Sequence, residues 1–421
     1  MIPNTNDHPC FNEEARKRAG RVHLPVAPDC NIQCRYCNRK YDCVNESRPG
    51  VTSGVLKPRG AVRWLSDVLT TRSEIRVVGI AGPGDPFANA PETMETLRLV
   101  RNEYPNMLLC VATNGLAIGP HIDELGALSV SHVTLTMNAV DPDIGKELYR
   151  WMRDGTRVLR GKDAARRLLD RQLLAIARLK RYDIIVKINA IIVPGVNDEH
   201  IEEVAKTAAA YGVDMLNCMP LYPAPDSDFE TIAEPDAGLI HRVRSLAGKH
   251  IPLMSHCSRC RADAVGFLGD TLSGSDRESL QKYSVGFPSD ERPYVAAATQ
   301  EGYLINEHLG RATEFLIYRA GVRGAECIER RTAPAPGGGD ARWDELADRL
   351  SDCFALVASV AGPRPQRLLE ERGIHVHIGS GLITDALESL FSGKPLPSHI
   401  AAAAPEKCKM GCGGNGGGCG A

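Results

Sequence analysis

The stretch RVHLPVAPDCNIQCRYCN, residues 21–38, decides how the rest of the chain is interpreted. Its first eight residues have the apolar composition of a strand, and the loop that follows carries Cys30, Cys34 and Cys37. Three thiolates at this spacing on one loop can each bind one iron of a four-iron cluster, which leaves the fourth iron free to chelate a small molecule. A zinc site is the alternative, but it requires a fourth nearby ligand and usually CxxC pairs.

Segments of strand type recur after this loop and alternate with segments of helix type. The expected strands are 75–81, 107–113, 133–138, 184–193, 213–219 and 250–255, and the expected helices include 58–71, 91–103, 198–211 and 235–249. Strands that alternate with single helices indicate repeated βα units and a parallel sheet. The expected fold class is therefore α/β, with an open or closed TIM-like (βα) barrel.

Polar residues stand near the ends of several of these strands, where a βα barrel carries its chemistry. Because side chains alternate along a strand, residues two apart share one face. Three sets share a face in this way: Thr134, Thr136 and Asn138; Lys187 and Asn189; Cys110, Ala112 and Asn114. Such residues either face the site or satisfy the backbone of nearby loops, and if Asn114 faces the barrel interior, then Cys110 does too.

The composition excludes several classes of protein. The 421 residues carry 50 Lys and Arg against 52 Asp and Glu, a net charge of −2, which argues against a nucleic-acid or acidic-membrane partner. No apolar run is long enough to span a membrane, and residues 1–18 lack the apolar core of a signal peptide, so we expect a cytoplasmic protein. The 14 cysteines are then expected to serve metal or redox chemistry rather than disulfides.

Changes in composition divide the chain into domains. Residues 1–268 form the expected barrel with an N-terminal cluster-binding segment, and the Ser/Gly-rich residues 269–292 are expected to be a linker. Residues 293–398 form a second, smaller α/β domain, with strands expected at 294–299, 313–320, 353–360 and 373–379. Residues 399–421 are glycine-rich, cannot pack a core, and are expected to be a flexible tail.

A basic stretch lies inside the barrel region, at residues 150–181. Leu169, Leu173 and Ile176 recur there at helical spacing, which predicts an amphipathic helix whose charges face solvent. A docking patch is the alternative interpretation.

The cysteine triplet, with an aromatic residue before its last cysteine, resembles the signature of the radical S-adenosylmethionine (SAM) enzymes. GIAGPGDP (79–86) resembles the glycine-rich strand end of that family, and IIVPGVND (191–198) resembles its later strand end near the adenine. The resemblance implies a [4Fe–4S] cluster whose open iron binds SAM, and reductive cleavage of SAM to a 5′-deoxyadenosyl radical. The residues it implies for cofactor binding are Tyr36, Gly82, Gly84, Asp85, Asn114, Thr136, Asn138, Asn189 and Ile192.

Further segments resemble the NifB family of radical SAM proteins: HPC (8–10), CNIQCRYCNRKYDCVNESRPGV (30–51) and HCSRCRADAVG (256–266). That resemblance implies fusion of two four-iron clusters around a SAM-derived carbide, which gives the iron–sulfur core precursor of the nitrogenase cofactor. It implies Cys30, Cys34 and Cys37 as the SAM-cleaving site, with Glu46 and Arg48 in proton handling or positioning, or in an ordinary loop salt bridge. The implied ligands of two precursor [4Fe–4S] clusters are His8, Cys10, Cys43, Cys110, Cys257 and Cys260.

The second domain resembles the NifX-like, ribonuclease-H-like domains fused to many NifB proteins, through INEHLGRATEFLIY (305–318). His308 is a candidate cluster ligand or a turn cap, and Cys408, Cys412 and Cys419 could carry iron. The implied partners are a low-potential ferredoxin or flavodoxin, an iron–sulfur donor, and carrier or scaffold proteins of nitrogenase assembly. Two other functions stay open: a different radical SAM enzyme with auxiliary clusters, and a non-catalytic iron–sulfur scaffold or carrier.

Overall fold

The computed structural model describes residues 5–45, 50–257, 259–322 and 324–401. The chain divides into two compact units, Met1–Arg277 and Glu278–Ala421. The division falls inside the segment expected to be a linker, part of which is helix α8, Gly274–Val285. None of the described helices combines the length and the apolar composition that a membrane crossing needs.

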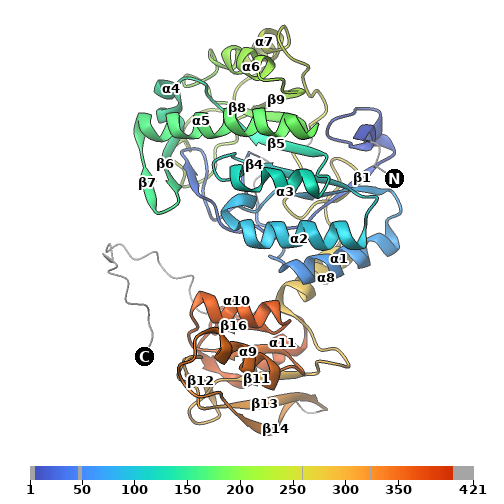
Figure 1. Ribbon diagram of the computed structural model, residues 1–421, viewed down its shortest axis with the longest axis vertical. Coiled ribbons are helices and arrows are strands. Elements are labelled where there is room, and N and C mark those ends of the chain that lie inside the picture. Colours follow the sequence, from blue (N-terminus) through green and yellow to red (C-terminus); the bar gives the residue numbers. More distant parts are fainter. Residues whose placement is uncertain (1–4, 46–49, 258, 323, 402–421) are drawn as a thin grey trace. The chain divides into compact units, whose positions relative to one another are not determined.

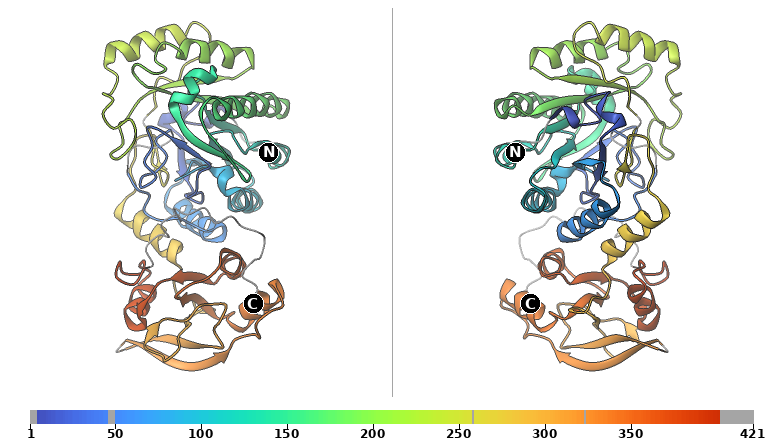
Figure 2. Two further views of the ribbon diagram at one scale, coloured as in Figure 1. Left: turned by 90° about the vertical axis from the view of Figure 1, so that its left-hand side faces the viewer. Right: turned by 90° about the vertical axis from the view of Figure 1, so that its right-hand side faces the viewer.

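The first unit is built on a seven-stranded sheet with the order β10-β1-β3-β4-β5-β8-β9. Neighbouring strands pair in parallel from β1 through β3, β4, β5 and β8 to β9, and the short β10 is antiparallel to β1. Figures 1 and 2 show helices α2, α3 and α5 on one side of these strands. The expected α/β barrel fold is therefore confirmed, and of the two forms left open the structure shows the open, partial barrel. The strands are β1 Gly20–His23, β3 Ile75–Ile80, β4 Leu108–Thr113, β5 His132–Thr136, β8 Ile185–Ile192, β9 Met215–Pro220 and β10 Val265–Gly266.

Helices connect the strands as the βα pattern predicts. They are α1 Pro58–Thr71, α2 Ala90–Glu103, α3 Ile122–Ala127, α4 Pro142–Leu148, α5 Gly161–Leu179, α6 Ile201–Ala210 and α7 Ala237–Ala247. The central strands are buried almost along their full length, which is typical of parallel sheets and explains their nearly continuous apolar sequences.

The strand register brings the polar strand residues into adjacent positions. Thr134 on β5 pairs with Lys187 on β8, and Thr136 pairs with Asn189. Asn189 in turn pairs with Asn217 on β9. All five side chains are buried, so the sheet carries a polar surface on its inner face.

Two parts of the first unit differ from the sequence prediction. Residues 250–255 do not form a regular strand: they make one bridge, Leu216 to Leu253, because Pro252 has no N–H to donate. The start of the basic stretch is a hairpin, β6 Tyr149–Asp154 and β7 Arg157–Leu159, and not a helix. Strand β6 also pairs with β2, Ile32–Cys34, within the cysteine loop.

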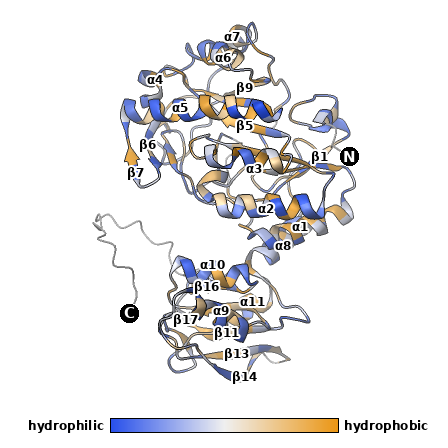
Figure 3. Ribbon diagram, viewed as in Figure 1, coloured by the Kyte–Doolittle hydropathy of each residue, from blue (hydrophilic) through white to orange (hydrophobic). Residues whose placement is uncertain are grey.

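The rest of the basic stretch forms the amphipathic helix α5, which Figure 3 shows striped with hydrophilic and hydrophobic residues. Its buried face differs slightly from the prediction. Ile176 is buried, whereas Leu169 and Leu173 are half-buried at the edge of that face. The centre of the face is formed by Ala164, Ala165, Leu168, Gln172, Ala175, Ile176 and Leu179.

The second unit contains a five-stranded sheet with the order β14-β13-β11-β15-β16. Apolar clusters around Phe315 and Phe354 form its core. Strand β14 was not predicted, because eight of its nine residues are exposed and its sequence, GAECIERRT, is charged rather than apolar. The elements are β11 Tyr294–Ala297, β12 Leu304–Ile305, β13 Glu314–Gly321, β14 Gly324–Thr332, α9 Asp340–Arg349, β15 Cys353–Ala358, α10 Pro363–Glu371, β16 His375–Ile378, β17 Gly381–Leu382 and α11 Ile383–Phe391.

The burial of α5 yields a test of the fold. Leu168 is 2% exposed and Leu174 on the same helix is 55% exposed. Leu168→Ala should lower the free energy of unfolding by about 2–5 kcal/mol, because it leaves a cavity under the helix. Leu174→Ala, the matched control, should change it by no more than about 0.5 kcal/mol. Denaturant unfolding followed by circular dichroism measures both values, and equal effects would contradict the assigned face.

Candidate active site

The cysteine loop follows β1 and packs into the apolar interior of the first unit. Cys34 and Cys37 are buried and Cys30 is half-buried. The loop is shaped by its own hydrogen bonds: Cys37 N donates to Cys34 O at 3.1 Å, and Gln33 Nε2 donates to the carbonyl oxygens of Cys34 and Cys37. The three thiols are therefore presented from one short, ordered segment.

Burial makes the thiols of this loop resist ionisation. Burial raises the pKa of the Cys30 thiol to about 12, and the nearby Asp85 carboxylate adds to the shift. Burial also raises the pKa values of Cys34 and Cys37. A bound metal removes this obstacle, because coordination favours the thiolate.

Across the described residues, no group of three His, Cys, Asp or Glu side chains is arranged to hold one metal ion. A multi-iron cluster does not require such convergence, since each thiolate binds a different iron atom.

The glycine-rich segment after β3 lies directly against the backbone that leads into the cysteine loop. Gly84 N donates to Ala27 O at 2.6 Å, and Asp85 N donates to Asp29 O at 2.7 Å. A Cβ atom at Gly84 would lie 2.1 Å from Asp29 O, so only glycine fits at this position. This contact fixes the entry of the cysteine loop relative to the sheet.

Asp85 joins the glycine-rich segment to the end of β4. The side chain is 3% exposed. One carboxylate oxygen accepts from the backbone N–H groups of Phe87 and Ala88, and the other accepts from Thr113 Oγ1 at 2.9 Å and from Asn114 N at 2.7 Å. Burial raises the pKa of Asp85, while these hydrogen bonds favour the carboxylate. Asp85, predicted to bind the cofactor, thus organises the surrounding backbone.

Asn114 and Thr136, two other predicted cofactor residues, lie at the ends of β4 and β5. Asn114 Nδ2 is 3.9 Å from Cys30 Sγ and donates to Asn31 Oδ1 at 2.7 Å. Gln172 of α5 donates to the carbonyl oxygens of both Asn114 and Thr136 at 2.7 Å. The strand ends beside Cys30 are therefore cross-linked by one helix side chain.

Tyr36 and Asn138 form the centre of a buried polar chain. Asn138 Nδ2 donates to Tyr36 Oη at 2.6 Å, and Tyr36 Oη donates to Asn45 Oδ1 at 2.9 Å. Asn138 Oδ1 accepts from Ile191 N at 2.8 Å, and Asn189 Nδ2 donates to Asn45 O at 3.0 Å. The cysteine loop, β5 and β8 are thereby joined.

Two asparagines of this chain were not predicted as site residues. Asn45 contacts Tyr36 and Asn189, and Asn197 Nδ2 donates to the carbonyl oxygens of Asn138 and Ile191. Asn197 lies within the segment IIVPGVND, and the resemblance of this segment to a radical SAM strand end could have identified it. Nothing in the sequence around Asn45 indicates its contacts. Ile192, also predicted, is buried at the end of β8.

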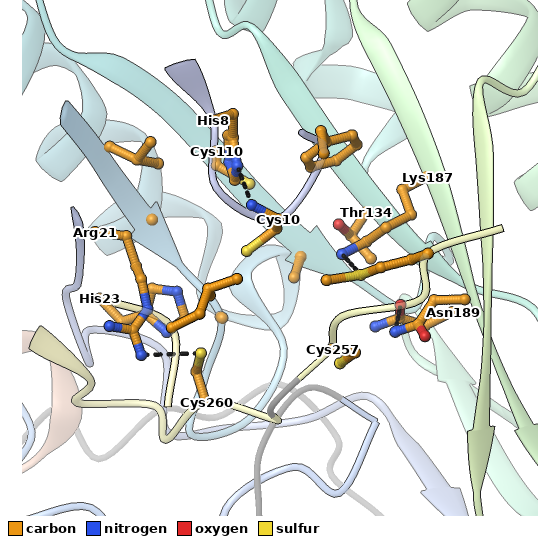
Figure 4. Close-up of a pocket in the computed structure, with 18 of the residues that line it drawn as sticks. His8, Cys10, Arg21, His23, Cys110, Thr134, Lys187, Asn189, Cys257 and Cys260 are labelled. Carbon is orange, nitrogen blue, oxygen red and sulfur yellow. Dashed lines mark hydrogen bonds between the residues drawn. The ribbon is translucent and has the colours of Figure 1, made fainter. Parts of the chain in front are cut away.

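A separate cavity lies on the inner face of the sheet, and its empty volume of about 630 Å³ includes open solvent. It is lined by five of the six predicted precursor-cluster ligands: His8, Cys10, Cys110, Cys257 and Cys260. Figure 4 shows these side chains entering from the N-terminal segment, from β4 and from the segment after β9. His256 holds two of these segments together, since its Nε2 lies 2.9 Å from Pro9 O.

Cys43 is not among the residues that line this cavity. Its backbone N donates to Pro83 O at 2.8 Å, and Asn45 Nδ2 lies 3.5 Å from its sulfur. The structure thus places Cys43 with the cysteine loop and the glycine-rich segment.

His8 lies in the cavity wall as a neutral ring with one unpaired nitrogen. The residue is 2% exposed, and burial together with His132 and Lys187 lowers its pKa well below the usual value, so the ring is neutral. Nδ1 accepts from Cys10 N at 3.1 Å, while Nε2 is buried without a hydrogen-bond partner. An orphaned polar atom in a cavity of thiols marks a position for a further group. Iron at Nε2 would require the ring proton to move to Nδ1.

His308, another predicted ligand, stands outside these two sites. His308 is half-buried in the second unit, and its Nδ1 accepts from Gly310 N at 2.9 Å, so it caps a turn. Its role as a cluster ligand stays a prediction. Glu46, Arg48 and the tail cysteines Cys408, Cys412 and Cys419 lie outside the described residues.

The contact at Gly84 can be tested by substitution. Gly84→Ala should displace the loop before Cys30 at a cost of about 1–3 kcal/mol or more, because the new methyl group meets the backbone of Asp29. Gly119→Ala is the control, since an added Cβ there meets nothing within 4 Å. We expect a lower melting temperature and less iron bound per chain for Gly84→Ala only, measured by circular dichroism and iron analysis. Unchanged values for Gly84→Ala would contradict the contact.

Comparisons with known proteins agree with this geometry. The radical SAM superfamily model matches residues 24–208, and the model of the dinitrogenase iron-molybdenum cofactor family matches residues 291–393. The FeMo cofactor biosynthesis protein NifB of Chlorobaculum tepidum is 50% identical over 423 residues, which cover 100% of both chains. NifB of Klebsiella pneumoniae is 37% identical over 402 residues, covering 87% of this chain and 86% of its own.

Among solved structures, Streptococcus suis SuiB bound to S-adenosylmethionine covers 57% of this chain and 53% of its own, at 16% identity and a TM-score of 0.41. That likeness is too remote to bear on function. The full-length identity to NifB proteins and the match of a family model to each unit are decisive. The chain belongs to the NifB family of radical SAM enzymes.

Proposed function

We propose that this radical SAM enzyme fuses two four-iron clusters around a SAM-derived carbon and so makes the iron–sulfur core precursor of the nitrogenase cofactor. The observation that carries this proposal is the cavity lined by His8 and four cysteines. A permanent electron-transfer cluster is normally held by four cysteines, so two such clusters would need eight. Fewer ligands, one of them a neutral histidine, suit clusters that must leave as product.

The residues of the cysteine loop fit the resident cofactor of this family, a [4Fe–4S] cluster with SAM. Cys30, Cys34 and Cys37 would hold the cluster, and the backbone after β3 at Gly82 and Gly84 would lie against SAM. When bound, the cluster and SAM together supply a methyl group and a carbon radical. The protein positions both groups. The hydrogen bonds of Asp85, Asn114 and Asn138 hold the strand ends and the cysteine loop in fixed positions relative to each other.

The two sites share a boundary, which supports their use in one reaction. Asn189 lines the cavity and also donates to Asn45 O, beside Tyr36 of the cysteine loop. Ala81 lines the cavity and directly precedes the glycine-rich segment. We place the two precursor clusters in and beside the cavity as substrate, because Cys43, the sixth ligand in this proposal, lies outside the cavity lining and next to the cysteine loop.

A low-potential ferredoxin or flavodoxin is the proposed electron donor. A second hollow is lined by Cys34 and Cys37 together with Arg35, Arg39, Arg150, Asp226 and Asp228. It would give a donor protein a separate route to the cluster, because it shares no lining residue with the cavity. An iron–sulfur donor and carrier or scaffold proteins of nitrogenase assembly are the other proposed partners.

The reaction can be tested on anaerobically reconstituted protein supplied with iron, sulfide, SAM and dithionite. We expect both S-adenosylhomocysteine, from methyl transfer, and 5′-deoxyadenosine, from hydrogen abstraction. Cys34→Ala is the control and should form neither product. Deoxyadenosine alone would assign the protein to a different radical reaction. Absence of both products from fully loaded protein would indicate a scaffold or carrier.

The second unit is proposed to hold or receive product rather than to catalyse. A chain truncated after Ser289 should therefore still form both SAM products, because every residue assigned to the two sites lies in the first unit. High-performance liquid chromatography of the reaction mixture measures this. Complete loss of both products from a folded, cluster-loaded truncated chain would show that the second unit takes part in the chemistry.

A further inference from the structure

The hairpin of β6 and β7, which opens the basic stretch, packs one of its faces on the cysteine loop. Met152 on β6 belongs to the same buried apolar cluster as Cys34 and Cys37. The backbone joins the hairpin to that loop as well, because Arg153 N donates to Asn31 O at 2.7 Å. Figure 1 shows β6 and β7 at the edge of the first unit, beside the start of α5. A partner on the other face of the hairpin would therefore lie one layer of sheet away from the cysteines.

The other face of the hairpin carries aromatic, aliphatic and cationic side chains. Arg153 pairs with Val158 across the two strands, so these side chains lie on the face opposite to that of Met152. Both are exposed, and Val158 has an exposed fraction of 44%. Trp151 lies two residues before Arg153 on β6 and is half-buried. Arg160 follows β7 in extended backbone, two residues after Val158, and is exposed. These four residues form the hairpin face.

Positive charge is concentrated on this hairpin. Residues 149–160 contain four arginines and one aspartate, although the whole chain has a net charge of −2. The aspartate is already neutralised, because Asp154 pairs with two arginines of α5 at 2.6 Å and 3.6 Å. Arg153, Arg157 and Arg160 are exposed, and none of them forms an ion pair with another residue that the structure describes. The hairpin therefore presents positive charge that the surrounding chain does not balance.

The positive surface continues to the hollow that is lined by Cys34 and Cys37. Arg150, at the start of β6, is one of the residues that line this hollow. Both aspartates of its lining form ion pairs, Asp226 with a lysine at 3.2 Å and Asp228 with two arginines at 3.1 Å and 3.5 Å. The unbalanced charge of the hairpin and the approach to the cysteines thus adjoin each other.

This surface fits an acidic protein that has to reach the cysteine loop. Opposite charges steer the encounter of two proteins and fix their orientation, and electron-transfer complexes are typically small and transient. Exposed aromatic and arginine side chains are the types enriched at protein interfaces. A ferredoxin has the matching chemistry, because its thiolate-bound cluster adds negative charge and reaches low potentials. A nucleic acid would match the charge, but an approach to buried cysteines has no use for it.

We propose that the hairpin face is the docking surface of an acidic ferredoxin. The proposal rests on the proposed function, because it takes the cluster of the cysteine loop as the electron acceptor. In the transfer, the ferredoxin is oxidised by one electron, the cluster of the cysteine loop is reduced by one electron, and no atom is transferred. Arg153 and Arg160 orient the carrier through charge, and Trp151 and Val158 provide the apolar centre of the contact.

The test compares ferredoxin binding by variants of the full-length chain, each loaded anaerobically with iron and sulfide. The hairpin variant, Arg153→Glu with Arg160→Glu, reverses two charges of the hairpin face. The matched control, Arg63→Glu with Arg242→Glu, makes the same change of net charge at exposed arginines of α1 and α7, which Figure 1 shows at a distance from β6 and β7. The probe is an acidic bacterial ferredoxin with two [4Fe–4S] clusters. Microscale thermophoresis at low and high salt measures its dissociation constant.

We expect the dissociation constant at low salt to rise at least about tenfold in the hairpin variant, and its dependence on salt to weaken. The control variant should bind like the unchanged chain. Reduction of the chain by reduced ferredoxin, followed by stopped-flow absorbance, should slow by a similar factor in the hairpin variant. Dithionite, a small reductant that needs no protein contact, should produce the same final electron paramagnetic resonance signal in all three chains.

Three results would overturn the docking surface. One is equal ferredoxin binding by the hairpin variant and the unchanged chain. Another is an equal loss of binding in the control variant, which would assign the effect to net charge and not to the hairpin. The third is binding of a flavodoxin or of duplex DNA, but not of the ferredoxin, through the hairpin face. Should the hairpin variant not fold, Arg153→Gln with Arg160→Gln in the same assay decides, with weaker binding supporting the surface and unchanged binding overturning it.

The docking surface and the proposed function fail in different ways. If the unchanged chain binds ferredoxin through the hairpin face but forms neither SAM product with dithionite, the proposed function is wrong and the surface stands. If both products form with dithionite while the hairpin variant binds ferredoxin normally, the surface is wrong and the function stands.

Discussion

The close approach of Gly84 to the carbonyl of Asp29 is the contact on which the SAM site depends. At a Cβ distance of 2.1 Å no other residue fits, and the approach allows two backbone hydrogen bonds between the segments. Asp85, the next residue, carries the constraint to the end of β4. Three parts of the chain that are distant in sequence, the cysteine loop and two strand ends, thereby become one rigid unit.

The two sites of the first unit differ in how their buried carboxylate, amide and imidazole groups are satisfied. Around the cysteine loop, Asp85 accepts four hydrogen bonds and the side chain of Asn138 bonds to both Tyr36 and Ile191. In the cavity, His8 Nε2 and Asn217 Oδ1 lack hydrogen-bond partners. Arginine atoms lack partners at both sites, Arg35 Nε in the loop and Arg21 Nε and Arg259 Nη1 at the cavity, so the difference concerns the other polar side chains.

The sequence predicted the fold where local pattern and burial agree. Helix α1 begins and ends at the predicted residues, and β3 and β4 differ by one residue at an end, because apolar runs and a helix-starting proline define them. Strand β14 was missed because its exposed, charged sequence carries no strand pattern. The cysteine triplet was recognisable from spacing alone, and the convergence of His8, Cys110 and Cys257 depended on a family resemblance.

Arg21 shows why the rest of the site could not be predicted. It stands inside β1 in an otherwise apolar run, and its role arises from Cys260 and Gly266, which are about 240 residues away in sequence. No periodicity indicates such a contact. The same holds for Arg259, whose position between two cysteines suggests only an exposed loop cation. The buried guanidinium of Arg21 is held by the carbonyl oxygens of Gly266 and Phe267, which only the folded chain brings to the end of β1.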